Sequence, residues 1–231
     1  AIFQKSCYCE PNCNIVALEA VKEINVPVDR LQYEFDIATV YSNASNTQFW
    51  GYNAEDRKIY SYDLVNQTFI DSIKIVEEGP NAIPEFFGMK VISPDSIYLH
   101  ANHFNELILI NNDGVPINSW PLVGDIPNGG FKADGYHLAT SSKFNNLFID
   151  QKKEKSIFFA YESGIYLPEN DFKAFSHPQF VELDLNTGKY IEAYGDYPIA
   201  YKNQTLTNYN VLFPFTVAEG EVWASFFNSH C

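Results

Sequence analysis

The chain has 231 residues, of which 46% are hydrophobic and 19% are charged, so a substantial core can form and global disorder is disfavoured. Its net charge of −14 repels phosphate backbones and anionic lipid headgroups, and no basic stripe with interleaved aromatic residues occurs, which argues against nucleic-acid binding. Aromatic residues make up 16% of the chain, and this enrichment favours strands, because aromatic side chains suit a pleated, half-buried surface.

Residues 1–34 are predicted to be a lead-in to the repeated part of the chain, which we expect to span residues 35–231. The segment opens on AIFQKSCYCE without a signal peptide, so we expect either a cytosolic protein or one whose leader has been removed. No apolar run in the chain approaches the roughly 18 residues that a membrane span needs.

The four cysteines are Cys7, Cys9, Cys13 and Cys231. They could form two disulfides in any of three connectivities, or a Cys₄ zinc site, or Cys7 could carry a lipid; an unstructured tail with incidental thiols is the remaining alternative. The C-x-C-x₃-C spacing differs from the paired C-x₂-C of common zinc sites, and the residues before Cys7 make a poor lipobox. We therefore predict no metal site and keep all four as candidates for disulfide or lipid attachment.

The chain contains three diluted copies of one hairpin. Each copy is an apolar stretch, a polar turn and a second apolar stretch: KIYSYDLVNQTFIDSIKI (58–75), LILINNDGVPINSW (107–120) and FVELDLNTGKYIEAY (180–194). The first and last copies align without a gap at Asp63 and Asp184, which places Tyr60, Tyr62 and Phe69 opposite Val181, Leu183 and Tyr190. A repeat of this kind indicates a structural module that is used several times.

A further strand is predicted upstream of each hairpin, and a second one farther upstream in the later units. The nearer strands are TQFWGY, DSIYLHA, KSIFFAY and, without a following hairpin, GEVWASFF (220–227); farther upstream lie FFGMKVIS, NNLFIDQ and LFPFTVA. Four strands in about 40–50 residues is the length of a propeller blade. We therefore predict an all-β protein, a β-propeller of four-stranded antiparallel blades with about four blades in this chain.

The candidate ligand-binding residues are polar side chains at or beyond the ends of predicted strands and at the end of the insertion. These are His100, Asn102, His103, His177 and His230, which we predict to lie on one rim of the blades. His177 closes the segment YESGIYLPENDFKAFSHP (161–178), the clearest insertion, and long loops on a rigid scaffold often carry function. His100 and His103 are three apart, so on one strand they would point to opposite faces, and joint metal ligation would require a turn.

The sequence contains no nucleophile-elbow, P-loop or dinucleotide-binding motif. Acidic pairs such as Glu55-Asp56 and Glu77-Glu78 are numerous, but sequence spacing does not show whether two carboxylates face one another across a cleft as a glycosidase requires. No catalytic residue and no cofactor are predicted.

The stretch EEGPNAIPEFFGMKVISPDSIYLHANHFNELILINNDG (77–114) and the terminal EVWASFFNSHC carry a family resemblance. They resemble uncharacterised six-bladed, TolB-like β-propeller lipoproteins of Bacteroidetes cell envelopes, which commonly contain an EGPN turn and a DSI strand. The resemblance extends from about Phe35 to the end. It implies a cell-envelope location (an outer-membrane lipoprotein, periplasmic or surface-exposed) and, because the chain holds about four units instead of six, a fragment of the propeller.

Two functions from different classes follow. The first is a non-enzymatic envelope protein that binds a protein or glycan ligand of the cell envelope through a blade rim, with no nucleic-acid partner and with membrane contact only through a lipid anchor. The alternative is a hydrolase or lyase that acts on a glycan or small ester at the central channel. A funnel with His and Asp or Glu within hydrogen-bond reach would favour the enzyme.

Overall fold

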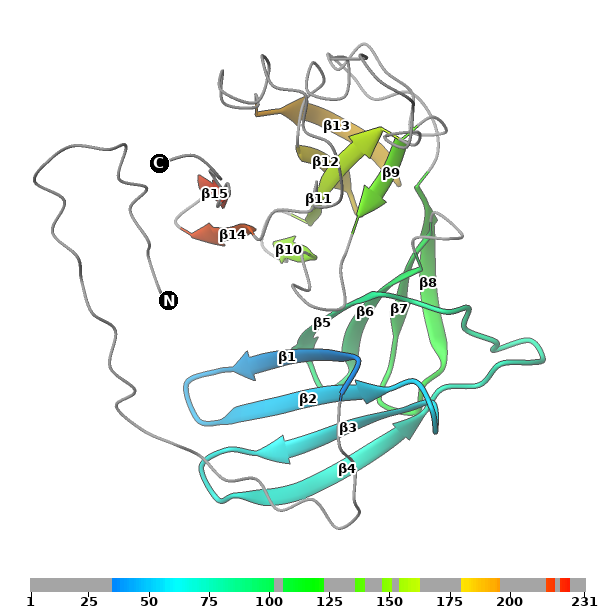
Figure 1. The fold of residues 1–231 in the computed structure, drawn as a ribbon, viewed down its shortest axis with the longest axis vertical. Coiled ribbons are helices and arrows are strands. Elements are labelled where there is room, and N and C mark those ends of the chain that lie inside the picture. Colours follow the sequence, from blue (N-terminus) through cyan, green and yellow to red (C-terminus); the bar gives the residue numbers. More distant parts are fainter. Residues whose placement is uncertain are drawn as a thin grey trace, which may run out of the picture.

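The structure is a computed structural model that describes residues 35–101, 106–122, 136–139, 147–150, 154–162, 180–195, 215–218 and 221–224. Within these ranges all regular secondary structure is β-strand, joined by turns and irregular connections (Figure 1). No helix in this part of the chain is long and apolar enough to cross a membrane.

The strands form antiparallel sheets in chain order. The first sheet is β1 (Ile37–Ser42), β2 (Thr47–Asn53), β3 (Lys58–Asp63) and β4 (Thr68–Lys74), and the second is β5 (Gly88–Ser93), β6 (Ser96–Ala101), β7 (Glu106–Ile110) and β8 (Pro116–Pro121). The third contains β10 (Phe148–Asp150), β11 (Lys155–Glu162), β12 (Phe180–Asp184) and β13 (Lys189–Tyr194), with β9 (Tyr136–Ala139) paired to the second half of β11. β14 (Phe215–Ala218) and β15 (Glu221–Ala224) form a two-stranded sheet.

The predicted repeat appears as the last hairpin of each of the first three sheets. Each hairpin has a register shift at the equivalent place: between Ser61 and Tyr62, between Leu109 and Ile110, and between Glu182 and Leu183. Such a bulge bends a strand and increases its twist. The three hairpins therefore share a local distortion as well as an apolar pattern.

The turns of these hairpins also share one mechanism. The side-chain Oδ1 of Asp63, Asn111 and Asp184 each accepts two backbone N–H groups of its own turn. Asx turns of this kind close a chain reversal with a local side chain. The hydrogen bonds to the charged form, chiefly from the backbone N–H of Asn66 and of Asn186, lower the pKa of Asp63 and of Asp184.

Successive sheets pack face to face through apolar side chains. One cluster joins the first two sheets and contains Ile37, Trp50, Tyr52, Ile59 and Ile73 together with Met89, Val91, Ile97, Leu99, Ile108 and Ile110. A second cluster joins the next pair and contains Tyr98, Leu107, Trp120 and Leu122 together with Leu147, Ile149, Val181, Leu183 and Tyr190. Full burial of one such side chain contributes about 1.5–3 kcal/mol, so these faces supply most of the stabilisation.

The first strands of the sheets lie next to one another. β1 contacts β5 and β5 contacts β10, and Figure 1 shows these three strands side by side with the later strands of each sheet farther out. The strand order follows the chain in the first two sheets and in β10–β13 of the third, where β9 lies off this path on β11. The first three sheets therefore approach one another along β1, β5 and β10.

Two close contacts fix neighbouring sheets against each other. The indole Nε1 of Trp120 in β8 donates to the carbonyl oxygen of Leu185, in the β12–β13 turn, at 2.6 Å. In the β7–β8 turn, Gly114 has φ +75°, and a Cβ there would lie 2.8 Å from the carbonyl oxygen of Lys74. Only glycine allows this turn to approach the end of β4 so closely.

The prediction of an all-β protein made of four-stranded antiparallel sheets is confirmed. All seven predicted upstream strands coincide with observed strands, from TQFWGY in β2 to GEVWASFF in β15. Residues 1–34 and Cys231 lie outside the described residues, so the division of the chain at residue 35 and the roles of the four cysteines stay predictions.

Candidate functional site

Of the five predicted ligand-binding residues, the structure describes His100. Asn102 and His103 belong to the β6–β7 connection, His177 to the β11–β12 connection, and His230 follows β15; all four lie outside the described residues. The structure therefore does not test whether these five side chains share a rim.

His100 lies near the end of β6 and is fully buried, at 0% exposure. It pairs with Gly88 of β5, and its carbonyl oxygen accepts the N–H of Phe87 at 3.0 Å. Burial lowers the pKa of the imidazole to about 3, so His100 is neutral at physiological pH. Its role as a ligand contact stays a prediction, but the side chain lies inside the protein instead of on the surface of a rim.

The described connection between β4 and β5 contains a run of exposed residues, 76–81. Residues 76–83, which we call the acidic loop, form a closed turn in which the N–H of Ile83 donates to the carbonyl oxygen of Val76 at 2.8 Å. Its tip contains Glu77, Glu78 and Gly79, all exposed, and Gly79 has φ +94°. The buried side chains of Ile75, Ile83 and Phe86 anchor the connection in the core between the first two sheets.

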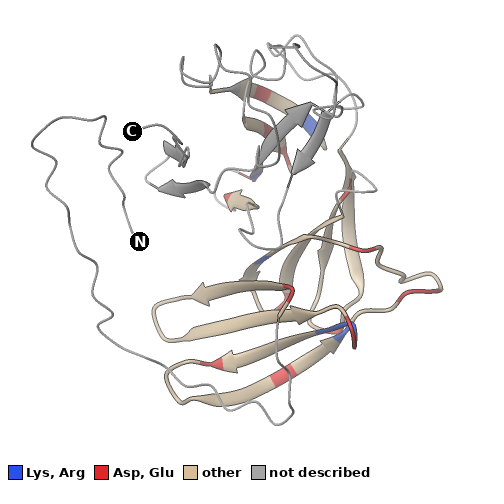
Figure 2. Cartoon of the chain, in the orientation of Figure 1, with Lys and Arg blue, Asp and Glu red and all other residues tan. Residues whose placement is uncertain are grey.

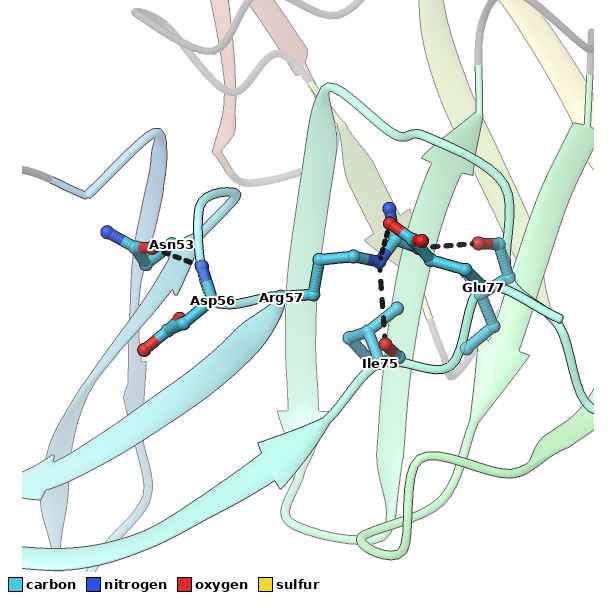
Figure 3. Close-up of polar contacts among 6 residues, drawn as sticks. Asn53, Asp56, Arg57, Ile75 and Glu77 are labelled. Carbon is cyan, nitrogen blue, oxygen red and sulfur yellow. Dashed lines mark hydrogen bonds and ion pairs between the residues drawn. The ribbon is translucent and has the colours of Figure 1, made fainter.

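Arg57 clamps the base of the acidic loop (Figure 3). Its Nη2 donates to the carbonyl oxygen of Ile83 at 2.9 Å and its Nε to that of Ile75 at 3.4 Å, so one guanidinium binds the chain on both sides of the loop. Nε also forms an ion pair with Glu77 at 3.1 Å, and the carbonyl oxygen of Arg57 accepts the N–H of Ile75 at 2.8 Å. The planar guanidinium suits this role, because its donors have a fixed geometry.

The β2–β3 turn that presents Arg57 is itself organised by carboxylates and amides. Asn53 Oδ1 accepts the N–H of Asp56 at 3.0 Å, and Asp36 Oδ2 accepts the N–H of Ala54 at 2.7 Å. The hydroxyl of Tyr60 donates to the carboxylate of Asp56. Arg57 adopts a left-handed φ of +52°, which the surrounding hydrogen bonds hold in place.

Several exposed carboxylates gather around this clamp, and we call them the acidic rim: Asp36, Glu55, Asp56, Glu77, Glu78 and Glu85. Figure 2 shows acidic segments on the β2–β3 turn and on the connection that follows β4. Beneath them the ring of Tyr52 is buried, with its centroid 4.3 Å from that of Phe86.

The pKa of Tyr52 is shifted by burial and by the charged groups around it. Burial raises this pKa most; Arg57 opposes the shift, and the negative charges of Asp36, Glu85 and Glu77 add to it. These four charged groups therefore act on one buried hydroxyl, although they come from three separate segments of the chain.

The acidic rim offers negative charge and hydrogen-bond acceptors. In the described part of the chain, Glu55, Glu78 and Glu85 are exposed and form no ion pair, while Glu77 is paired with Arg57. Among all the residues that the structure describes, no group of three His, Cys, Asp or Glu side chains is arranged to hold a metal ion. The rim is therefore suited to contact a positively charged partner.

No sequence pattern marks Arg57 as a functional residue. The pairs Glu55-Asp56 and Glu77-Glu78 and the EGPN turn are visible in the sequence, but a surface cluster of carboxylates has no distinguishing sequence spacing. The clamp joins Arg57 to backbone carbonyls 18 and 26 residues away, and a carbonyl oxygen leaves no signal in a sequence.

Replacing Arg57 with Ala should lower the free energy of unfolding by about 2–3 kcal/mol, because hydrogen bonds from a charged donor contribute about 1.5–3 kcal/mol. Glu77→Gln should cost less than about 1 kcal/mol, since an exposed ion pair contributes little. Urea unfolding measures both values, and hydrogen exchange should show faster exchange at the Ile83 N–H in Arg57→Ala only. Equal losses in the two variants would contradict the clamp.

The buried imidazole of His100 should make stability depend on pH. Its pKa is about 3 in the folded protein against 6.5 in the unfolded chain, so between these values the unfolded state binds the extra proton. The contribution of neutral His100 to the free energy of unfolding is therefore fully present above pH 6.5. It decreases as the pH falls below 6.5, by up to about 1.4 kcal/mol per pH unit.

This pH dependence can be measured by urea unfolding between about pH 6.5 and 4.5, above the range in which Asp63 and Asp184 take up protons. His100→Gln should flatten the slope whatever its effect on overall stability. Equal slopes in the wild type and in His100→Gln would rule out this role for the buried imidazole.

Comparisons with known proteins support a family assignment and a fold. Among solved structures, a member of the DUF4221 family from Bacteroides vulgatus has a TM-score of 0.67 at 21% identity, over 91% of this chain and 58% of its own. Dihydro-heme d1 dehydrogenase NirN has a TM-score of 0.37 at 10% identity, over 77% of this chain and 32% of its own. BamB from Moraxella catarrhalis has a TM-score of 0.29 at 10% identity, over 65% of this chain and 38% of its own.

The similarities to NirN and BamB are too low to relate either protein to this chain. The comparison with curated proteins found no match. The family model described as "Domain of unknown function (DUF4221)" matches residues 18–229. The chain therefore belongs to the DUF4221 family.

Proposed function

We propose that this protein is a non-enzymatic β-propeller of the cell envelope that binds a protein partner through the acidic rim. The observation that carries the proposal is the Arg57 clamp, which holds an exposed carboxylate-bearing loop in one conformation. Binding residues are often found on loops that a rigid scaffold positions. A loop that is already ordered loses little conformational entropy when a partner binds.

The chemistry of the rim favours a protein over a glycan. Sugar binding commonly uses an exposed aromatic ring, whereas the aromatic rings beneath the rim are buried, with Tyr52 at 3% and Phe86 at 2% exposure. Exposed carboxylates instead complement Lys and Arg side chains, which steer association through long-range attraction. The negative charge of the acidic rim therefore favours a protein partner with a basic surface.

The propeller and the envelope location are supported by separate observations. Face-to-face sheets with adjacent first strands are the arrangement expected of propeller blades. The resemblance in residues 77–114 includes the acidic loop and is to envelope lipoproteins, so Cys7 is kept as the proposed lipid attachment. Asn102 and His103 follow β6 in the chain and are kept as proposed partner contacts.

Removing three unpaired rim charges should weaken partner binding. The variant combines Glu55→Gln, Glu78→Gln and Glu85→Gln, and a control with the same charge change combines Asp95→Asn, Glu154→Gln and Glu192→Gln, which are exposed carboxylates outside the acidic rim. At about 0.5 kcal/mol for each exposed pair, the rim variant should lose about 1.5 kcal/mol, or roughly tenfold in affinity.

The measurement is capture of partners from a solubilised envelope extract by the immobilised protein, followed by quantitative mass spectrometry. A partner retained by the wild type and the control, lost by the rim variant and released at about 1 M salt is the expected result. A captured partner that the rim variant retains as well as the control would refute binding through the acidic rim.

A further inference from the structure

The last strand of each of the first three sheets contains one residue that its partner strand does not match. β4, β8 and β13 each end the strand order of their sheet, so in the described part of the chain no strand pairs with their outer edges. The register of these strands leaves out Ile70, Ile117 and Ile191. These three residues are therefore the extra residues of the bulges, and we call them the bulge isoleucines.

The bulge isoleucines do not pack in the core. Ile70, Ile117 and Ile191 are 44%, 57% and 45% exposed. The register shift in β5 leaves out Ile92 in the same way, but this side chain packs against the second core cluster and is partly buried. Core packing can therefore account for the bulge in β5. It does not account for the same bulge recurring in three outer strands.

A bulge changes what an outer edge offers to another strand. An unpaired edge presents a row of N–H and C=O groups to which a further strand can add. The extra residue disrupts the ladder and bends the strand, so a straight strand cannot match the edge on both sides of the bulge. The longest uninterrupted stretches are 71–74, 118–121 and 192–194, at most four residues each. This is shorter than the average strand of about 5–6 residues.

The residues beside the bulges act in the same direction. Asp71 and Glu192 follow the bulge isoleucines of β4 and β13, and both are exposed. β8 begins with Pro116 and ends with Pro121, and proline has no N–H to donate to an added strand. Charged residues and prolines on edge strands hinder edge-to-edge pairing. Composition and backbone geometry therefore point to the same role.

We propose that the three bulges close the outer edges of β4, β8 and β13 to strand addition, so that a second copy of the chain does not pair there. A second copy is the partner concerned because two equal antiparallel edges can join around a two-fold axis. The same block excludes ligands that bind by adding a strand to a sheet. The proposal is independent of the acidic rim, whose role rests on side-chain charge.

Deleting a bulge isoleucine should give a regular edge strand without turning its side chains over. In the first sheet, Phe69 pairs with Tyr62 and Asp71 pairs with Ser61. Without Ile70, these two pairs would follow each other as in an uninterrupted ladder, and the other residues of β4 would keep their faces. The same holds for β8 and β13, because each bulge contains a single extra residue.

The test uses the 231-residue chain and two triple variants. One lacks all three bulge isoleucines. The matched control keeps the bulges but removes much of their exposed apolar surface, with the substitutions Ile70→Thr, Ile117→Thr and Ile191→Thr. Sedimentation velocity at increasing protein concentration measures self-association, and hydrogen exchange locates the strands that become protected. Urea unfolding at low concentration shows whether each variant is folded.

The deletion variant should self-associate at least about tenfold more strongly than the wild type and the threonine control, because each regular edge gains several cross-strand pairs. Hydrogen exchange in β4 and β13 should slow as the concentration rises. Among single deletions, that of Ile117 should have the smallest effect, because the prolines of β8 remain.

Three results would overturn the proposal. A folded deletion variant that associates no more than the threonine control would show that the bulges do not guard the edges. Association changed by the threonine substitutions and not by the deletions would assign the effect to the exposed side chains. A deletion variant that is unfolded at low concentration would show that the bulges serve the packing of their own sheets.

Discussion

Apolar packing between the faces of successive sheets is the constraint on which the rest of the structure depends. A lone four-stranded sheet exposes two faces, and here both faces of the second sheet are apolar, so neither can remain in water. Each sheet therefore needs its neighbours. The contacts of Trp120 with Leu185 and of Gly114 with Lys74 then set how closely the neighbours approach.

This packing also explains the position of the acidic rim. The connection between β4 and β5 must pass from one sheet to the next, and it buries Ile75, Ile83 and Phe86 in the first core cluster on the way. The residues between the first two anchors, 76–82, are forced outward as a loop. Arg57 satisfies carbonyl groups at the base of that loop, so the carboxylates at its tip are held away from the core.

Local patterns made most of the fold predictable from the sequence. The hairpins are recognisable because Asp63, Asn111 and Asp184 begin turns whose hydrogen bonds lie within a few residues. The site was less predictable, because its contacts are not local. The complete burial of His100 is not marked by the pattern of its own strand, and Arg57 acts on backbone atoms, which carry no side-chain signature.

Native-state hydrogen exchange of Trp120→Phe tests most directly whether neighbouring sheets stabilise each other. The substitution leaves the Leu185 carbonyl without its indole donor, at a cost of about 1–3 kcal/mol. Trp50→Phe is the control, because its indole N–H bonds Gln48 within one strand, at 3.1 Å. We predict that Trp120→Phe accelerates exchange in β12 and β13 as much as in β7 and β8; acceleration confined to β7 and β8 would contradict the account.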